Sequence, residues 1–184
     1  MILIPENEYT AILDACVLAP MPICDTLLRV AAEGMYQPFW STEILREVGA
    51  YLSKRGYSQE QVNHRLTKMK EAFPEACVCL PDGFTKGFEC IPDENDKHVV
   101  AAAVKVKAHV IVTANTKDFP AECLKQYELL SHTPDTFLLH QFHLNRRAVL
   151  NALDRQAVAI GEDRGKLIDR FQAVMPEFYA LLKS

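Results

Sequence analysis

The chain has 184 residues, of which 24 are acidic and 20 are basic, giving a formal net charge of −4. That length suits one domain with a sizeable core, and 49% hydrophobic residues are ordinary for a globular protein. No apolar run approaches the length needed to cross a bilayer, so a membrane-spanning role is excluded. The negative charge gives no general sign of nucleic-acid affinity, but clustered active-site acids would also lower the total.

The first residues of the chain and its cysteines indicate the cellular compartment in which we expect the protein. Residues 1–8 lack the basic start and long apolar stretch of a secretory signal, so we expect a cytoplasmic protein. The six cysteines are scattered and form no C-x-x-C pair. We therefore expect buried free thiols, in preference to a zinc site or disulfide bonds.

Strand-like and helix-like segments alternate along most of the chain. Ser41 and Ser58 are expected to cap helices, and Pro176 to kink or break the last one. In chain order, the expected elements are strand 9–14, helix 22–32, strand 36–40, helix 41–54, helix 58–72, strand 76–80, helix 94–107, strand 109–113, a short helix or turn 120–126, strand 127–130, and helices 135–143, 145–160 and 166–182.

This order predicts an α/β fold with a parallel sheet covered by helices on both faces. Ligands in such folds gather beyond the carboxyl ends of the strands. From residue 134 onward the pattern is helical only.

Asp14 is the most informative residue, because it ends the apolar run Ala11-Ile12-Leu13. A carboxylate left unpaired among such neighbours carries a large desolvation cost. An N-cap would explain Asp14 without a function, but the next helix is expected to begin later, near Pro20. Asp14 is therefore a candidate ligand for a metal.

Two pairs of acids lie at the starts of expected helices. Glu43 complements a helix dipole in the first turn, whereas Glu47 lies beyond that turn and is the better candidate ligand. After Pro92, Asp93 can serve as an N-cap and Asp96 can extend a capping box. Because Asp96 directly precedes a buried helical face, we favour it as the ligand and Asp93 as a cap or outer acid.

A last polar cluster follows the buried strand 109–113. Asn115 is either a turn residue or a holder of metal-bound water, and Asp118 can cap the next short helix. Thr113 and Ser41 are candidates to orient the carboxylates that bind the metal.

Four motifs in this order resemble the PIN-domain family of metal-dependent nucleases. The closing run, residues 133–138, is also similar to VapC-like toxins of bacterial type II toxin–antitoxin pairs. The motifs are Ile12-Leu13-Asp14-Ala15-Cys16-Val17, the run from Trp40 to Val48, the run from Asp93 to Ala103, and Val110-Ile111-Val112-Thr113-Ala114-Asn115 followed by Lys117-Asp118-Phe119-Pro120.

The resemblance implies a three-layer α/β/α fold with a doubly wound parallel sheet of about five strands. It implies a nuclease domain over residues 1–138 and a helical extension over 139–184, packed on that domain or on a partner. It also implies an RNA substrate and a cognate antitoxin protein, and it leaves a homodimer open.

The implied activity is endoribonuclease cleavage with Mg²⁺ or Mn²⁺. Asp14, Glu47 and Asp96 would bind the metal, and Asn115 and Asp118 would complete the catalytic set. A metal-activated water would attack phosphorus in line and leave 5′-phosphate and 3′-hydroxyl ends. The family often has Asp where this chain has Asn115, so Asp118 becomes a candidate substitute.

Two rival functions deserve comparison. A phosphatase with a nucleophilic Asp needs a second Asp two positions later, and Cys16 occupies that position here. A non-catalytic RNA-binding or scaffold relative stays open because of Asn115. Arg146, Arg147 and Arg155 are candidates to contact the RNA backbone.

Overall fold

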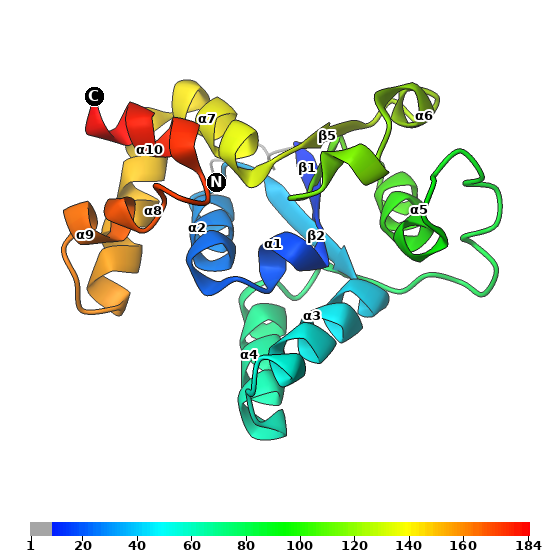
Figure 1. Ribbon diagram of the computed structural model, residues 1–184, viewed down its shortest axis with the longest axis horizontal. Helices are drawn as coiled ribbons and strands as arrows, with labels where there is room; N and C mark the ends of the chain where they lie inside the picture. The colour runs from blue at the N-terminus through cyan, green and yellow to red at the C-terminus, as the bar shows by residue number, and fades with distance from the viewer. Residues whose placement is uncertain (1–8) are drawn as a thin grey trace, which may run out of the picture.

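The computed structural model describes residues 9–184 and shows a five-stranded parallel sheet (Figure 1). Residues 1–8, which carry the expectation about a secretory signal, lie outside the described part. The strand order is β3-β2-β1-β4-β5. The strands are β1 (Thr10–Leu13), β2 (Gln37–Ser41), β3 (Cys77–Val78), β4 (Val110–Val112) and β5 (Leu130–His132). The predicted α/β class and strand number are confirmed.

Helices cover both faces of this sheet, with α2 and α5 on opposite sides of β1 and β2 (Figure 1). Coverage on both faces explains why β1 and β4 are buried along their whole length and are almost continuously apolar. The helices are α1 (Ala15–Leu18), α2 (Met21–Ala32), α3 (Thr42–Lys54), α4 (Gln59–Ala72), α5 (Lys97–Lys105), α6 (Ala121–Lys125), α7 (Pro134–Leu144), α8 (Arg146–Ala159), α9 (Arg164–Asp169) and α10 (Pro176–Lys183), with 3₁₀ turns η1 (Glu94–Asp96) and η2 (Thr116–Asp118).

The order in which strands are added to the sheet changes side at β1. The chain adds β2 and β3 on one side of β1, and then β4 and β5 on the other. Leu13 pairs with Val112, so the residues that follow, Asp14 and Thr113, emerge next to each other. Such a switch point is where open α/β sheets bind ligands.

The predicted helix caps are confirmed. The Ser41 hydroxyl accepts a 3.1 Å hydrogen bond from the amide of Ile44 at the start of α3. Ser58 and Gln61 form a reciprocal capping box at the start of α4. These local bonds fix where both helices begin.

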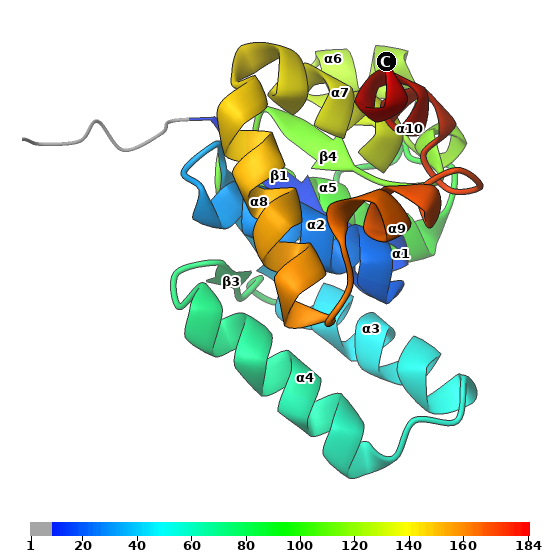
Figure 2. The ribbon, with the colours of Figure 1, turned by 90° about the vertical axis from the view of Figure 1, so that its left-hand side faces the viewer.

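The C-terminal helices pack on the rest of the chain. In Figure 2, α8 runs along α2, and the buried hydroxyl of Thr26 donates a 2.7 Å hydrogen bond to Gln156. The Asp135 carboxylate accepts bonds from two amides at the start of α10. The expected division at residue 138 falls inside α7 and stays a prediction.

One expected strand was placed wrongly, and one short helix was missed. The last strand was expected at 127–130 but spans Leu130–His132, because Glu128 takes the left-handed conformation with φ 56° and ends a helical turn. The four-residue helix α1 was missed, and Asp14 is its N-cap. The expected break of helix 166–182 at Pro176 is confirmed, since α9 ends at Asp169 and α10 starts at Pro176, which has no amide to continue a helix.

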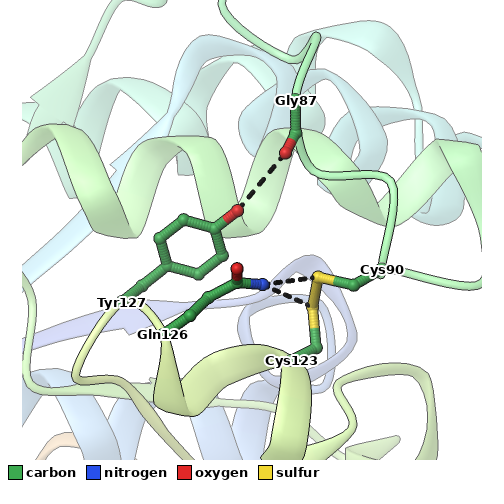
Figure 3. The surroundings of a disulfide bond; sticks show 5 residues. All are labelled: Gly87, Cys90, Cys123, Gln126 and Tyr127. Atoms are coloured by element: carbon green, nitrogen blue, oxygen red, sulfur yellow. Dashed lines mark hydrogen bonds between the residues drawn. A yellow bond between two sulfur atoms is a disulfide. The ribbon is translucent and has the colours of Figure 1, made fainter.

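The expectation of free thiols was wrong for two cysteines, because Cys90 and Cys123 form a disulfide (Figure 3). Their Cα atoms are 5.6 Å apart, a separation usual for such a bond. The bond joins the loop before η1 to α6, where the Tyr127 hydroxyl also donates to the Gly87 carbonyl at 3.3 Å. Of the free cysteines, Cys24 is buried as expected, Cys16 and Cys77 are half-buried, and Cys79 is exposed.

Among the helices of residues 9–184, none combines the length and the apolar character that crossing a membrane requires.

Candidate active site

Asp14 is held at the switch point by three donors. Its carboxylate accepts from the Ala15 amide at 2.6 Å, the Thr113 hydroxyl at 2.8 Å and the Cys16 thiol at 3.0 Å. The residue is only 8% exposed. The N-cap role that the sequence argued against is therefore real, but capping uses one oxygen only, while the other faces β4.

Cys16 links the ends of β1 and β4. Its sulfur accepts a 3.1 Å hydrogen bond from the Ala114 amide while its thiol lies against the Asp14 carboxylate. Burial, followed by the negative charge of Asp14, raises the pKa of the Cys16 thiol to about 12. Cys16 is therefore a neutral hydrogen-bond donor at pH 7 and not a nucleophile.

Asp96 lies within electrostatic reach of other acids. Burial, together with the negative charges of Asp14, Asp118 and Asp93, raises its pKa to about 6. These four acids come from three separate segments, which follow β1, surround η1 and form η2. A site with more negative charge than the protein itself neutralises is suited to a cation.

The two glutamates of α3 have different surroundings. Glu43 forms an ion pair with Arg46, whose Nε donates at 2.9 Å, and this bond lowers the pKa of Glu43. Glu47 lies 3.1 Å from Nε2 of His98, and these two residues line a polar hollow of about 380 Å³. The ion pair with the exposed Arg46 agrees with the structural role that was expected for Glu43.

The remaining expected polar residues are paired locally. Asp93 caps η1 by accepting from the Asn95 amide at 2.9 Å, as expected for a cap. The Asn115 side-chain amide donates to the Asp118 carboxylate, and the Asn115 backbone amide donates to Thr113 at 3.1 Å. Asn115 therefore orients Asp118, the acid that was expected to replace the missing one.

The acids fit a divalent cation by their chemistry. Within residues 9–184, no three His, Cys, Asp or Glu side chains are already close enough to enclose an ion. The charge that raises the pKa of Asp96 nevertheless shows that the acids act on one another. Carboxylate oxygens are the donors that Mg²⁺ and Mn²⁺ accept, so the donor set suits such an ion.

The three arginines expected to contact RNA all lie on α8. Arg146 and Arg147 are exposed, and the Arg146 guanidinium lies 5.4 Å from the Phe142 ring. Arg155 forms a 3.1 Å ion pair with Glu33 at the end of α2. The first two are free to meet a phosphate, whereas Arg155 would first have to leave Glu33.

The sequence did not point to His98, and it gave Cys16 no place in the site. One signal for His98 was available: it stands two residues after Asp96 in a helical run expected to be buried. A buried histidine needs a polar partner. Nothing in the local sequence names Glu47 as that partner.

Comparisons with known proteins agree with the geometry. The family model described as PIN domain matches residues 10–117, a range that includes Asp14, Glu47 and Asp96 and ends one residue before Asp118. The chain belongs to the PIN-domain family. This confirms the fold and the family that the sequence motifs indicated.

One curated relative carries a functional name. The PIN-domain chain is 39% identical over 90 residues to "Putative ribonuclease VapC50" of Mycobacterium tuberculosis (strain ATCC 25618 / H37Rv). The match covers 44% of this chain and 53% of the relative, so the chain spans about half the length of that protein. No solved structure matches the chain.

Proposed function

We propose that this PIN-domain protein is a divalent-metal-dependent endoribonuclease and the toxin of a toxin–antitoxin pair. The observation that carries the proposal is the meeting of Asp14, Asp96 and Asp118 at the switch point, with the pKa of Asp96 raised by burial and by its acidic neighbours. The name of the curated relative, a ribonuclease, supports the same substrate class.

Asp14, Glu47 and Asp96 would hold Mg²⁺ or Mn²⁺. When bound, the ion supplies positive charge for an anionic phosphodiester and a Lewis acid for hydrolysis. Thr113 and Cys16 hold the Asp14 carboxylate in place by hydrogen bonds. Asn115 holds Asp118 in the same way.

The rest of the chain has supporting roles in this proposal. Residues 139–184 form a helical extension that stabilises α2 and contributes no catalytic group. Arg146 and Arg147, with Arg155 once released from Glu33, would guide the RNA backbone. Each such contact would add salt-dependent affinity.

The test is cleavage of a labelled RNA by purified protein at increasing Mn²⁺, with EDTA as the blank. We expect cleavage that saturates with metal and yields 5′-phosphate ends, read by their susceptibility to a 5′-phosphate-dependent exonuclease. Cleavage that persists in EDTA, or cyclic phosphate ends, would contradict the proposal. RNA binding without cleavage would favour the scaffold alternative.

The toxin role is tested in cells. Induced expression should arrest growth, and co-expression of a neighbouring small open reading frame that encodes an antitoxin should restore it. Growth arrest that is unchanged in the Asp14→Asn variant would separate toxicity from the proposed cleavage.

A further inference from the structure

His98, which is not among the residues that the family resemblance indicated, contacts one of the proposed metal ligands. His98 lies in the first turn of α5, and its Nε2 is 3.1 Å from Oε1 of Glu47 on α3, 51 positions earlier in the chain. The His98 side chain is 10% exposed and that of Glu47 is 31% exposed. The contact therefore joins two helices at the carboxyl edge of the sheet.

The hydrogen bonding of the ring points in one direction. Nδ1 of His98 is buried and has no hydrogen-bond partner within residues 9–184. The ring therefore forms its hydrogen bond with Glu47, in which Nε2–H is the donor and the carboxylate is the acceptor. An unprotonated Nδ1 leaves no buried donor without a partner.

The position of His98 relative to other acids gives a second observation. His98 stands two residues after Asp96, where η1 passes into α5, and it lines the same polar hollow as Glu43 and Glu47. The hydrogen bond to His98 thus ties Glu47 to the segment that carries Asp96. A bond to this largely buried ring limits the rotation of the Glu47 side chain.

We infer that His98 is a positioning residue, which holds the Glu47 carboxylate in the orientation needed to share a divalent cation with Asp14 and Asp96. The inference rests on the proposed function and adds a residue to it. Partners that orient metal-binding carboxylates generally contribute 10–100-fold to metal affinity. We expect that range for His98.

Two substitutions separate positioning from packing. His98→Gln keeps an N–H donor the same number of bonds from the backbone but loses the ring. His98→Phe keeps a ring of similar size but loses the donor. If His98 positions Glu47, the Gln variant keeps most of the Mn²⁺ affinity, and the Phe variant binds Mn²⁺ about 10–100-fold more weakly.

The measurement is Mn²⁺ affinity by calorimetry or by the loss of the free-ion electron paramagnetic resonance signal. Thermal unfolding of each variant establishes the folded fraction, so that weaker binding is not mistaken for unfolding. A Phe variant that binds like wild type, or a Gln variant that loses as much as Phe, would overturn the inference.

A double-mutant cycle with Glu47→Gln tests whether His98 affects metal binding through Glu47. If His98 acts through Glu47, His98→Phe adds no further loss in the Glu47→Gln background. An equal loss in both backgrounds would mean that His98 acts on the metal directly and would contradict the inference. Glu43→Gln, on the same helix, is the control background, in which the His98→Phe loss should be unchanged.

Mn²⁺ binding by the wild-type protein distinguishes failure of the positioning role from failure of the proposed function. If wild type and His98→Phe bind Mn²⁺ equally tightly, only the positioning role fails. If wild type takes up no Mn²⁺, the proposed function fails together with it.

Discussion

The Thr113 hydroxyl donates a 2.8 Å hydrogen bond to the Asp14 carboxylate across 99 positions of sequence. The bond exists because β1 and β4 are neighbours and pair Leu13 with Val112. Both partners are buried, Thr113 fully and Asp14 to all but 8%. The order of strands in the sheet thus creates the local chemistry of the site.

Removing this hydroxyl should weaken both the fold and the proposed activity. Thr113→Val keeps the shape but leaves a buried carboxylate with one donor fewer, which costs about 1–3 kcal/mol in the free energy of unfolding. Urea unfolding measures that loss, and RNA cleavage should fall as well. Thr26→Val, which removes a buried 2.7 Å bond to Gln156 away from the acids, should lower stability with cleavage unchanged.

The raised pKa of Asp96 predicts an unusual pH dependence of stability. The carboxyl has a pKa of about 6 in the folded protein, against about 4 in an unfolded chain. Between these values the folded state binds more protons, so metal-free stability should fall as pH rises from about 4 to 6. Below about pH 4 this penalty is absent.

Urea midpoints across this range, without metal, give the measurement. Asp96→Asn should flatten the fall, and saturating Mn²⁺ should oppose it in wild type. The exposed Asp169→Asn on α9 is the control and should keep the wild-type profile. A profile identical in wild type and Asp96→Asn would show that another group is responsible.

The two glutamates of α3 should behave differently. Glu43 is paired with the exposed Arg46, so Glu43→Ala should change the free energy of unfolding by less than about 1 kcal/mol and leave cleavage largely intact. Glu47→Ala should abolish Mn²⁺-dependent cleavage, because this carboxylate, which His98 contacts, is one of the three proposed metal ligands. Loss of turnover in Glu43→Ala with retention in Glu47→Ala would reverse the assignment.

The disulfide should contribute to stability. Cys90→Ser opens a link between positions 33 residues apart and should lower the free energy of unfolding by about 2–4 kcal/mol. Reduction of wild type should have the same effect, whereas Cys79→Ser, an exposed free thiol, should have little. Equal melting temperatures with and without reductant would show that the bond is absent or without consequence in solution.

Local features of the fold were accessible from sequence. The caps Ser41 and Ser58 act within three residues, so their sequence signal is complete. The buried strand 109–113 was recognised because apolar residues on both faces leave no helical period. The error at 127–130 has a conformational cause, since the sequence does not show that Glu128 adopts a positive φ.

Contacts between distant segments were not accessible. The pair His98–Glu47 and the disulfide Cys90–Cys123 both depend on which elements the fold brings together. For Asp14, one property could be predicted from the sequence and another could not. Its importance was visible in the apolar run before it, but its N-cap role was missed because α1 is only four residues long and has almost no periodic pattern.

The most direct test of the central claim is Mn²⁺-dependent RNA cleavage by Asp14→Asn beside Asp169→Asn, an equal charge change on the far helix α9. The Asn side chain keeps one oxygen that can cap α1, and its amide group can donate to the Thr113 hydroxyl in place of accepting from it, so the fold should persist, as judged by an unchanged unfolding transition. We expect Asp14→Asn to lose cleavage and Asp169→Asn to retain it. Full cleavage by a folded Asp14→Asn variant would contradict a catalytic site at the end of β1.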